Sequence, residues 1–219
     1  MKVLILSCNT GGGHNSAAAA IKDCFEKMGH RCDIVNALDF LPKAKAEFIS
    51  KGHVLAYKYA PKLYGAGYRM SEMLPQKGLY EQNAKGADEL CKKLFSGGYD
   101  IVISVHIFAA MMMTEFRISR EIDIPSFFVA TDYTCSPGVS EIDADCYFIP
   151  HEKLRDEFVS QGIRADRIVA SGIPVREEFL SRTDKAAARR TLGLTEDGRV
   201  LLMCCGSMGC GHIRSIAYK

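Results

Sequence analysis

The sequence lacks any apolar run long enough to cross a membrane as a helix. Its longest such run is 107–113, whereas a membrane-spanning helix needs about 20 consecutive apolar residues. The start, MKVLILSCN, also has too few apolar residues for the core of a secretory signal peptide. We therefore expect a protein that is soluble, or one that lies on a membrane without crossing it.

The sequence also lacks a strong net charge and a paired cysteine motif. The formal net charge is only +2, which gives no general attraction to nucleic acid. The nine cysteines are odd in number and contain no C-x-x-C pair. With no signal peptide, this usage favours reduced thiols in the cytosol over a disulfide scaffold.

Apolar runs that alternate with helical patterns dominate what is present. The chain has 219 residues, 47% of them hydrophobic, which is enough for one sizeable core or for one domain and the start of another. Buried strands are predicted at 2–7, 31–39, 99–106, 124–132, 145–150 and 166–174. Helical patterns lie between most of them, so the sequence predicts a doubly wound α/β fold with a Rossmann-like parallel sheet.

Residues 40–82 interrupt this alternation with cations and tyrosines among few acids. One interpretation is an ordinary solvated insertion of helices and loops. The other is a membrane surface, because lysines attract anionic lipids and aromatic rings settle at the level of the head groups. The candidate membrane residues are Lys58, Tyr59, Lys62, Tyr64 and Arg69.

The stretch NTGGGHNS lies between the first strand and the first helix, where the amides of a helix N-terminus favour anions. Its spacing matches neither the dinucleotide fingerprint nor the P-loop. Gly11, Gly12 and Gly13 either cradle phosphates or only allow tight packing of the strand and the helix. His14 is either a polar residue at a helix start or a proton acceptor at the edge of the sheet where ligands bind.

Two further titratable side chains end predicted strands. His106 ends SVH, and Asp132 lies in TDY, where it either enters the same crevice as His14 or caps a turn. A second glycine loop, CCGSMGCGH, carries Gly206, Gly209 and Gly211, whose amides are suited to approach a diphosphate. The cysteines there have the wrong spacing for a four-ligand zinc site, so we expect no metal.

The strand pattern returns near residue 198 in VLLM. We interpret it as the first strand of a second, truncated α/β domain. The expected division is a first domain at 1–175 with the insertion at 40–82, a linker at 176–197, and the start of the second domain at 198–219.

Five segments in this order, GGGHNSAA, YKYAPKLYG, ATDY, SGIPVREEF and VLLMCCGSMGCG, resemble the monogalactosyldiacylglycerol synthase and processive diacylglycerol glucosyltransferase family. The resemblance covers the whole chain. It implies an inverting glycosyltransferase of the GT-B fold, related more distantly to the glycosyltransferase that makes lipid II. In that fold the first domain binds the lipid acceptor and meets the membrane, and the second binds a UDP-sugar. This chain would then hold the first domain and only the opening of the second, and would be inactive alone.

The resemblance also assigns residues. Gly11, Gly12, Gly13 and His14 match the loop near the acceptor and the donor phosphates, and Thr131 and Asp132 match the TD turn. Gly206, Ser207, Gly209 and Gly211 match the second loop. Many members carry H-P-x-W after the TD turn, whereas this chain reads Cys135-Ser136-Pro137-Gly138 and has no tryptophan. That departure leaves the acceptor open.

We therefore expect transfer of a hexose from a UDP-sugar to a diacylglycerol-type lipid, at the inner face of the cell membrane and without a cofactor or nucleic acid. His14 or Asp132 would take the acceptor proton, and Thr131 and His106 would line the substrate site. Two alternatives stay open. One is a lipid- or nucleotide-binding module without catalysis; the other is a related UDP-sugar enzyme, either a peptidoglycan-precursor glycosyltransferase or an epimerase.

Overall fold

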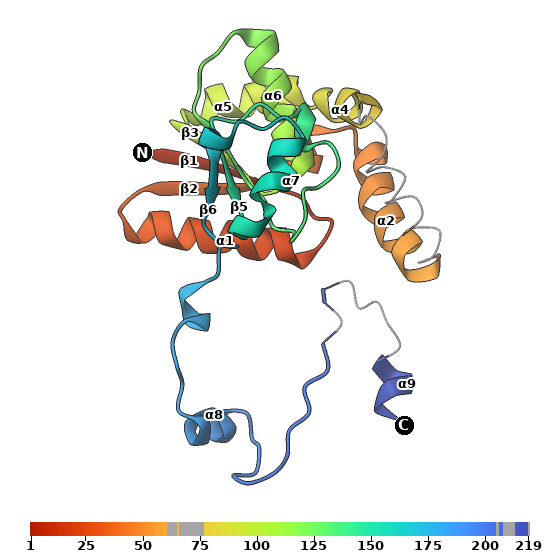
Figure 1. Cartoon of the computed structure of the whole chain (residues 1–219), viewed down its shortest axis with the longest axis vertical. Helices are drawn as coiled ribbons and strands as arrows, with labels where there is room; N and C mark the ends of the chain where they lie inside the picture. The colour runs from red at the N-terminus through yellow and green to blue at the C-terminus, as the bar shows by residue number, and fades with distance from the viewer. Residues whose placement is uncertain (61–64, 66–76, 205, 208–212, 219) are drawn as a thin grey trace.

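One parallel sheet of six strands organises the chain, in the order β2-β1-β3-β4-β5-β6 (Figure 1). The computed structural model describes residues 1–60, 65, 77–204, 206–207 and 213–218. The strands are β1 Lys2–Ser7, β2 Arg31–Asn36, β3 Ile101–Ser104, β4 Ser126–Val129, β5 Cys146–Ile149 and β6 Ile168–Ala170. The predicted α/β class and Rossmann-like sheet are confirmed.

Helices connect these strands. The α-helices are α1 Gly12–Lys27, α2 Lys43–Tyr59, α4 Lys77–Ala84, α5 Ala87–Gly97, α6 Ile107–Arg120, α7 Arg155–Ser160, α8 Lys185–Thr191 and α9 Ile213–Ala217. Short 3-10 helices are η1 Ala37–Phe40, η2 Val139–Glu141, η3 Glu152–Leu154, η4 Ala165–Arg167 and η5 Glu177–Phe179. The predicted insertion contains α2 and α4.

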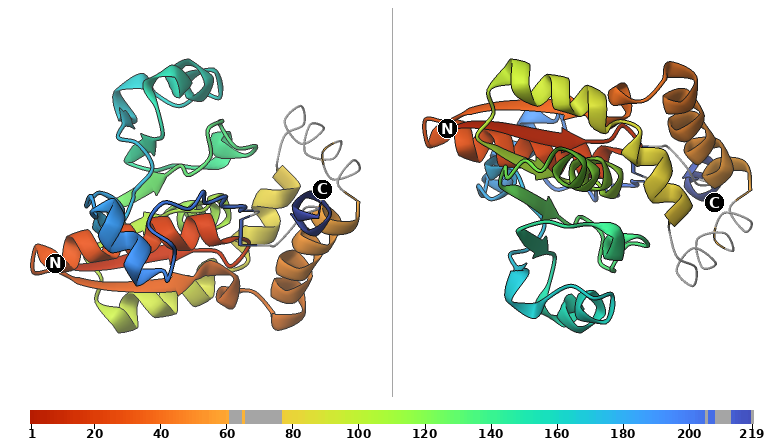
Figure 2. Two further views of the ribbon diagram at one scale, coloured as in Figure 1. Left: turned by 90° about the horizontal axis from the view of Figure 1, so that it is seen from below. Right: turned by 90° about the horizontal axis from the view of Figure 1, so that it is seen from above.

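Strand β1 is apolar without interruption because both of its faces are covered. Val3 and Ile5 pack with Ala18 of α1 on one face. Leu4 and Leu6 pack on the other face, with α5 and α6. Figure 2 shows these helices on opposite sides of the strands. A strand buried on both faces cannot show polar alternation, which is the pattern found in its sequence.

The strand order creates a switch point between β1 and β3. After β1 the chain passes through α1 into β2, which pairs with β1 on one side of the sheet. After β3 it passes through α6 into β4, which pairs with β3 on the other side. The two helices lie on opposite faces, so the loops after β1 and β3 diverge at the carboxyl edge. Ligands of open parallel sheets bind in the crevice at such a point.

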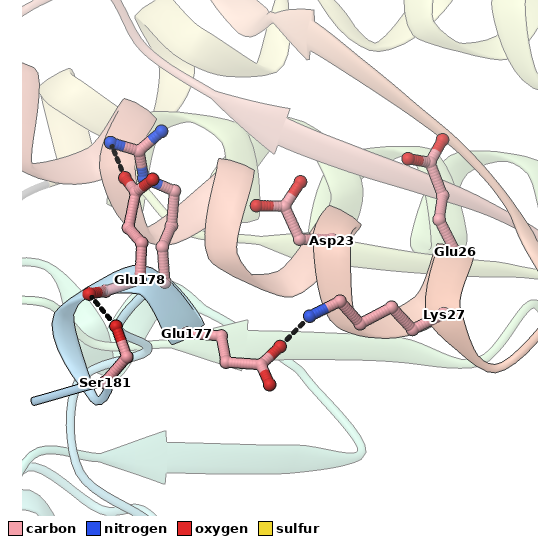
Figure 3. A pocket seen from close by; sticks show the side chains of 7 residues that line it. Asp23, Glu26, Lys27, Glu177, Glu178 and Ser181 are labelled. Atoms are coloured by element: carbon pink, nitrogen blue, oxygen red, sulfur yellow. Dashed lines mark hydrogen bonds and ion pairs between the residues drawn. The ribbon is translucent and has the colours of Figure 1, made fainter.

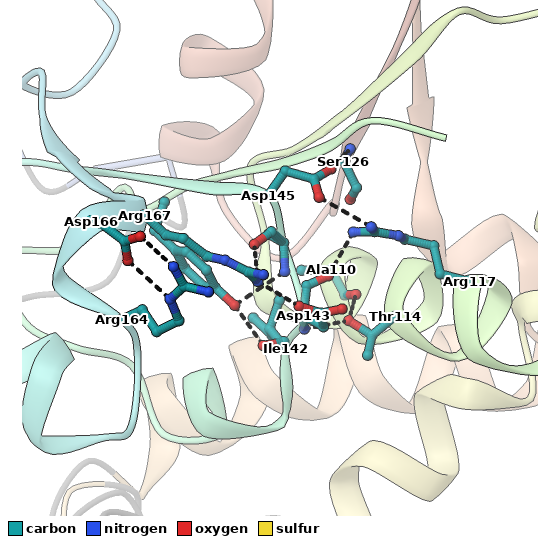
Figure 4. Close-up of polar contacts among 12 residues, drawn as sticks. Ala110, Thr114, Arg117, Ser126, Ile142, Asp143, Asp145, Arg164, Asp166 and Arg167 are labelled. Carbon is teal, nitrogen blue, oxygen red and sulfur yellow. Dashed lines mark hydrogen bonds and ion pairs between the residues drawn. The ribbon is translucent and has the colours of Figure 1, made fainter. Parts of the chain in front are cut away.

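The amino edge of the sheet is closed by ion pairs, as Figure 4 shows. Arg117 of α6 donates to Asp145, 3.1 Å away, and the other oxygen of Asp145 accepts from the Ser126 amide at 2.7 Å. Arg167 pairs with Asp143 at 2.9 Å. These bonds join α6 to the starts of β4, β5 and β6, so this edge serves the fold and leaves the carboxyl edge for chemistry.

The strand predicted near residue 198 does not form. Residues 199–204 contain no strand, and Val200, Leu201 and Leu202 are 57%, 79% and 82% exposed. An apolar run becomes a strand only beside a strand to pair with, and no described strand lies there. Figure 1 shows the chain after β6 extending away from the sheet. The division at 175 and 197 stays a prediction.

Candidate functional site at the carboxyl edge

The loop between β1 and α1 is held by a chain of side-chain hydrogen bonds. Ser7 Oγ donates to Asn15 Oδ1 at 2.6 Å, and Asn15 Nδ2 donates to Asn9 Oδ1 at 2.9 Å. The backbone amide of Asn9 donates to Asn36 Oδ1, 3.1 Å away at the end of β2. The loop is therefore fixed to both neighbouring elements before any ligand binds.

The start of α1 has no cap of its own. Its N-cap residue is Gly11, no side chain caps it locally, and no acidic residue lies in the first turn. The amide of Gly12 donates instead to Ser207 Oγ at 2.6 Å. Two residues predicted from separate glycine loops, Gly12 and Ser207, are thus brought together from opposite ends of the chain.

The three glycines have different surroundings. A Cβ at Gly12 would lie 2.8 Å from Ser207 Cβ, so only glycine permits this approach. Among the described residues, a Cβ at Gly11 or Gly13 would meet nothing within 4 Å. The space in front of Gly11 and Gly13 is open, as a cradle for a ligand requires.

His14 is the half-buried centre of the site. Its Nδ1 lies 3.0 Å from the carbonyl oxygen of Val105 and 2.8 Å from Thr131 Oγ1. A carbonyl oxygen only accepts hydrogen bonds, so Nδ1 carries the proton and donates it. In the neutral ring Nε2 then holds a lone pair, and it has no hydrogen-bond partner among the described residues.

His106 lies behind His14 and is only 8% exposed. Its Nδ1 accepts from the Phe108 amide at 3.1 Å, which caps α6, and its Nε2 lies 3.2 Å from Thr10 Oγ1. The rings of His106 and His14 meet edge to face, with centroids 4.5 Å apart. We place His106 as a support of the site, because both of its nitrogens are engaged by the protein.

Asp132 is exposed and contacts Ser136, with 3.4 Å between Ser136 Oγ and its carboxylate. We expected Asp132 to share the crevice with His14. The described contacts instead join His14 to the preceding residue, Thr131. Of the TD pair, the threonine is therefore the member that touches the histidine.

Two buried cysteines near the site, Cys8 and Cys135, are poor nucleophiles. Burial raises the pKa of Cys8 to about 12, and burial together with Glu157 raises that of Cys135 to about 12. Both thiols therefore keep their protons near neutral pH. In the part of the chain that the structure describes, no group of three or more His, Cys, Asp or Glu is arranged to hold a metal ion.

The predicted membrane surface is described only in part. Leu55 and Tyr59, one helical turn apart on α2, are 61% and 71% exposed. Lys62, Tyr64, Arg69, Gly209 and Gly211 lie outside the described residues, as does the side chain of Lys58. Within the described ranges, no helix is long and apolar enough to span a membrane.

A hollow of about 650 Å³ lies at the opposite end of α1, between that helix and η5 (Figure 3). It is lined by Asp23, Glu26, Lys27, Arg176, Glu177, Glu178 and Ser181. Lys27 pairs with Glu177 and Arg176 with Glu178, so its cations are already neutralised. We assign it no part in the site around His14.

Sequence reasoning missed Thr10, Asn15 and the Val105 carbonyl. The two side chains carried a usable signal, because each lies within one turn of the predicted glycine loop after β1. A backbone carbonyl has no signal in the sequence, since every residue has one. Its role depends on which strand end lies beside His14.

Comparisons with known proteins agree on one family. The profile described as monogalactosyldiacylglycerol (MGDG) synthase matches residues 14–175. A processive diacylglycerol beta-glucosyltransferase of Staphylococcus saprophyticus is 26% identical over 95% of this chain and 53% of its own length. One of the same name from Bacillus cytotoxicus is 24% identical over 98% of this chain and 56% of its own. The chain thus spans about half the length of these relatives.

The solved structure of the lipopolysaccharide outer core galactosyltransferase WaaB in its apo form is a distant neighbour. The two chains have a TM-score of 0.40 and 15% identity, over 78% of this chain and 45% of that one.

Proposed function

The chain belongs to the monogalactosyldiacylglycerol synthase family, and we propose that it supplies the acceptor side of an inverting glycosyltransferase with two facing domains. The reaction moves a hexose from a UDP-sugar to a diacylglycerol-type lipid. The observation that carries this proposal is the position of His14. Its Nε2 lone pair is free among the described residues, beside the start of α1, where no local side chain caps the helix.

The proposed chemistry needs one base and one anion site. The acceptor hydroxyl gives its proton to Nε2 of His14 while its oxygen bonds to the anomeric carbon of the sugar. The bond from that carbon to the phosphate oxygen breaks, and UDP leaves with the electron pair. Attack from the face opposite the leaving group inverts the anomeric centre.

The departing diphosphate is stabilised in this proposal by backbone amides. The N-cap residue of α1 provides no side-chain cap and no acidic residue lies in the first turn, and helix N-termini bind phosphate well. Ser207 reaches the same turn from the C-terminal segment. We place the donor phosphates between these two loops. We also propose that the 219-residue chain alone transfers no sugar, because it spans only about half the length of its relatives.

The lipid acceptor approaches from the membrane in this proposal. Exposed Leu55 and Tyr59 lie on one face of α2, and the surrounding segment 40–82 is rich in cations. That combination supports a peripheral position on an anionic membrane surface, which we propose to be the inner face of the membrane.

The transfer assay tests the function directly. The longest reading frame that contains this chain is expressed and incubated with labelled UDP-glucose or UDP-galactose and diacylglycerol vesicles. Label in the lipid extract supports the proposal. Free sugar isomers would point to an epimerase, and binding of UDP-sugar and lipid without transfer would reduce the protein to a binding module.

The membrane contact is tested by vesicle flotation. The protein should bind vesicles with anionic lipid more tightly than neutral ones, and added salt should weaken the binding because charges are screened. Leu55→Ser with Tyr59→Ser should lower binding at every salt concentration. Equal binding to neutral and anionic vesicles would remove the electrostatic part of the proposal.

A further inference from the structure

We propose that Thr131 is a positioning residue for His14, which fixes the ring so that Nε2 faces the acceptor with its lone pair. This inference rests on the proposed function and deepens it. Thr131 was expected from the sequence to bind substrate. Its contact with His14 gives it a different task.

The first step is the shared proton on Nδ1. Val105 O and Thr131 Oγ1 both lie within hydrogen-bond distance of Nδ1, at 3.0 and 2.8 Å. Because the carbonyl cannot donate, the single N–H points between the two oxygens. The threonine hydroxyl accepts from it and keeps its own proton for another partner.

The second step concerns rotation of the ring. Val105 follows β3 and Thr131 follows β4, two neighbouring strands, while His14 lies on α1. Two acceptors from two strand ends define a direction for the N–H that a single acceptor would leave free to swing. The edge-to-face contact with the His106 ring, at 4.5 Å, blocks one side.

The third step is the support behind Val105. His106 is the next residue, it is buried, and its Nε2 lies 3.2 Å from Thr10 Oγ1 in the β1–α1 loop. Its Nδ1 accepts from the Phe108 amide. In its neutral form His106 therefore carries its proton on Nε2, the opposite arrangement to His14. The strand end that presents the Val105 carbonyl is thus tied to the loop that precedes His14.

The fourth step is the effect on proton transfer. When the acceptor hydroxyl gives its proton to Nε2, the ring becomes an imidazolium, and its Nδ1–H bonds strengthen because the donor is charged. Thr131 thereby stabilises the charged ring through its bond to Nδ1. Asp132 is exposed and contacts Ser136, so it does not supply this bond.

The tautomer of His14 tests this inference. A long-range nitrogen–hydrogen correlation spectrum of the labelled chain, recorded at alkaline pH where imidazole is neutral, reports which nitrogen carries the proton. His14→Gln identifies the signals of His14. We expect Nδ1–H for His14 and Nε2–H for His106, so the spectrum of each ring serves as the reference for the opposite tautomer. Nε2–H for His14 in the unaltered protein would overturn the inference.

Variants of Thr131 separate its effect on His14 from that of the Val105 carbonyl. In Thr131→Val the Val105 carbonyl still accepts from Nδ1, so the Nδ1–H form should persist, but the Nδ1 resonance should shift because one of its two acceptors is lost. Thr131→Ser keeps both acceptors and should leave that resonance in place. Thr134→Val is the matched control, because the Thr134 hydroxyl bonds to Glu157 rather than to His14. An unchanged Nδ1 resonance of His14 in Thr131→Val would overturn the role of Thr131.

Kinetics of the full reading frame give an independent readout. Thr131→Val should lower kcat by roughly tenfold to a hundredfold, the size expected for one hydrogen bond to a charged group, with little change in KM. Thr131→Ser should restore kcat. If the His14 tautomer and the spectra of the Thr131 variants are as expected but no sugar is transferred, the positioning of His14 by Thr131 is supported and only the proposed function fails. If sugar is transferred but Thr131→Val leaves the Nδ1 resonance of His14 and kcat unchanged, only this inference fails.

Discussion

At the scale of single residues, the three glycines of the first loop do different things. Gly12 leaves room for Ser207, since a Cβ there would overlap it. Gly13 has no positive φ, and it has no neighbour among the described residues that a Cβ would meet. The backbone at Gly13 therefore does not require glycine, and we expect glycine at this position to add no stability to the free protein. A glycine without a structural reason at a helix start is consistent with a ligand that needs the space.

Gly13→Ala should therefore stabilise the protein. Alanine restricts the unfolded chain and suits a helix, so we expect the free energy of unfolding to rise by about 0.4–1 kcal/mol in urea titrations. The same variant should lower sugar transfer, because the methyl group enters the proposed phosphate cradle.

The matched control is Gly98→Ala. Gly98 ends α5 with a φ of 61°, where a Cβ is strained, so this change should destabilise the protein. A loss of stability in Gly13→Ala as well would mean that the loop glycine has a structural role in the free protein.

The sequence predicted His14 as a proton acceptor because a histidine after a strand, a glycine loop and a helix start is typical of a site. It did not predict which of Thr131 and Asp132 contacts His14. Neighbouring residues in a loop point in different directions, and the direction depends on the turn that follows β4. The Val105 carbonyl and the tautomer it sets were beyond the sequence for the same reason.

At the scale of elements, the two edges of the sheet differ in what they carry. Ion pairs that stabilise the fold lie at the amino edge, and the candidate site lies at the carboxyl edge. The amino edge is joined by Arg117, Asp145 and Asp143, and the carboxyl edge carries His14, Thr131 and the open glycines. The candidate site thus lies where the helices α1 and α6 diverge.

Arg117→Ala should cost stability because it leaves Asp145 without its cation at a packed edge. The Arg117 side chain is 15% exposed, so we expect a loss of about 1–3 kcal/mol in urea unfolding, typical for a lost hydrogen bond to a charged group. Arg164→Ala is the control. Arg164 pairs only with Asp166 at the surface, and both are more than 60% exposed, so its loss should stay within about 0.5 kcal/mol. Equal losses would show that the Arg117 bonds do not hold the edge.

Strand positions were predictable, whereas strand lengths were not. The predicted strand at 99–106 pairs only over Ile101–Ser104. Tyr99 and Val105 lie outside the paired strand but are buried. An apolar sequence pattern indicates burial rather than strand pairing, so it predicted too long a strand. The strand predicted at Val200, Leu201 and Leu202 is absent altogether. A strand needs a second strand to pair with, and an apolar sequence pattern does not show whether one is present.

At the scale of the whole molecule, the segment after β6 differs from the sheet. Leu180, Leu192, Leu201 and Leu202 are each more than 70% exposed, which is unusual for large apolar side chains in one segment. The predicted division into a first domain at 1–175 and a linker at 176–197 agrees with this exposure without being tested by it.

Limited trypsin digestion tests that division. Exposed Arg182, Lys185, Arg190 and Arg199 lie in the predicted linker and just beyond it. Linkers with few contacts are cut first, so mass spectrometry should find early cleavage at these sites while the sheet residues stay joined. Protection of 182–199, with earlier cuts between β3 and β6, would contradict the predicted boundary.

The central claim is that His14 at the β1–β3 switch point takes the acceptor proton. Its most direct test is the turnover of His14→Ala in the full reading frame, with His30→Ala at the far end of α1 as the matched control. General-base assistance is typically worth ~10²–10⁴-fold. We predict that His14→Ala loses at least ~10²-fold in kcat and still binds lipid vesicles, while His30→Ala keeps its turnover. Turnover of His14→Ala close to that of the unaltered protein, or a larger loss in Asp132→Asn, would contradict the claim.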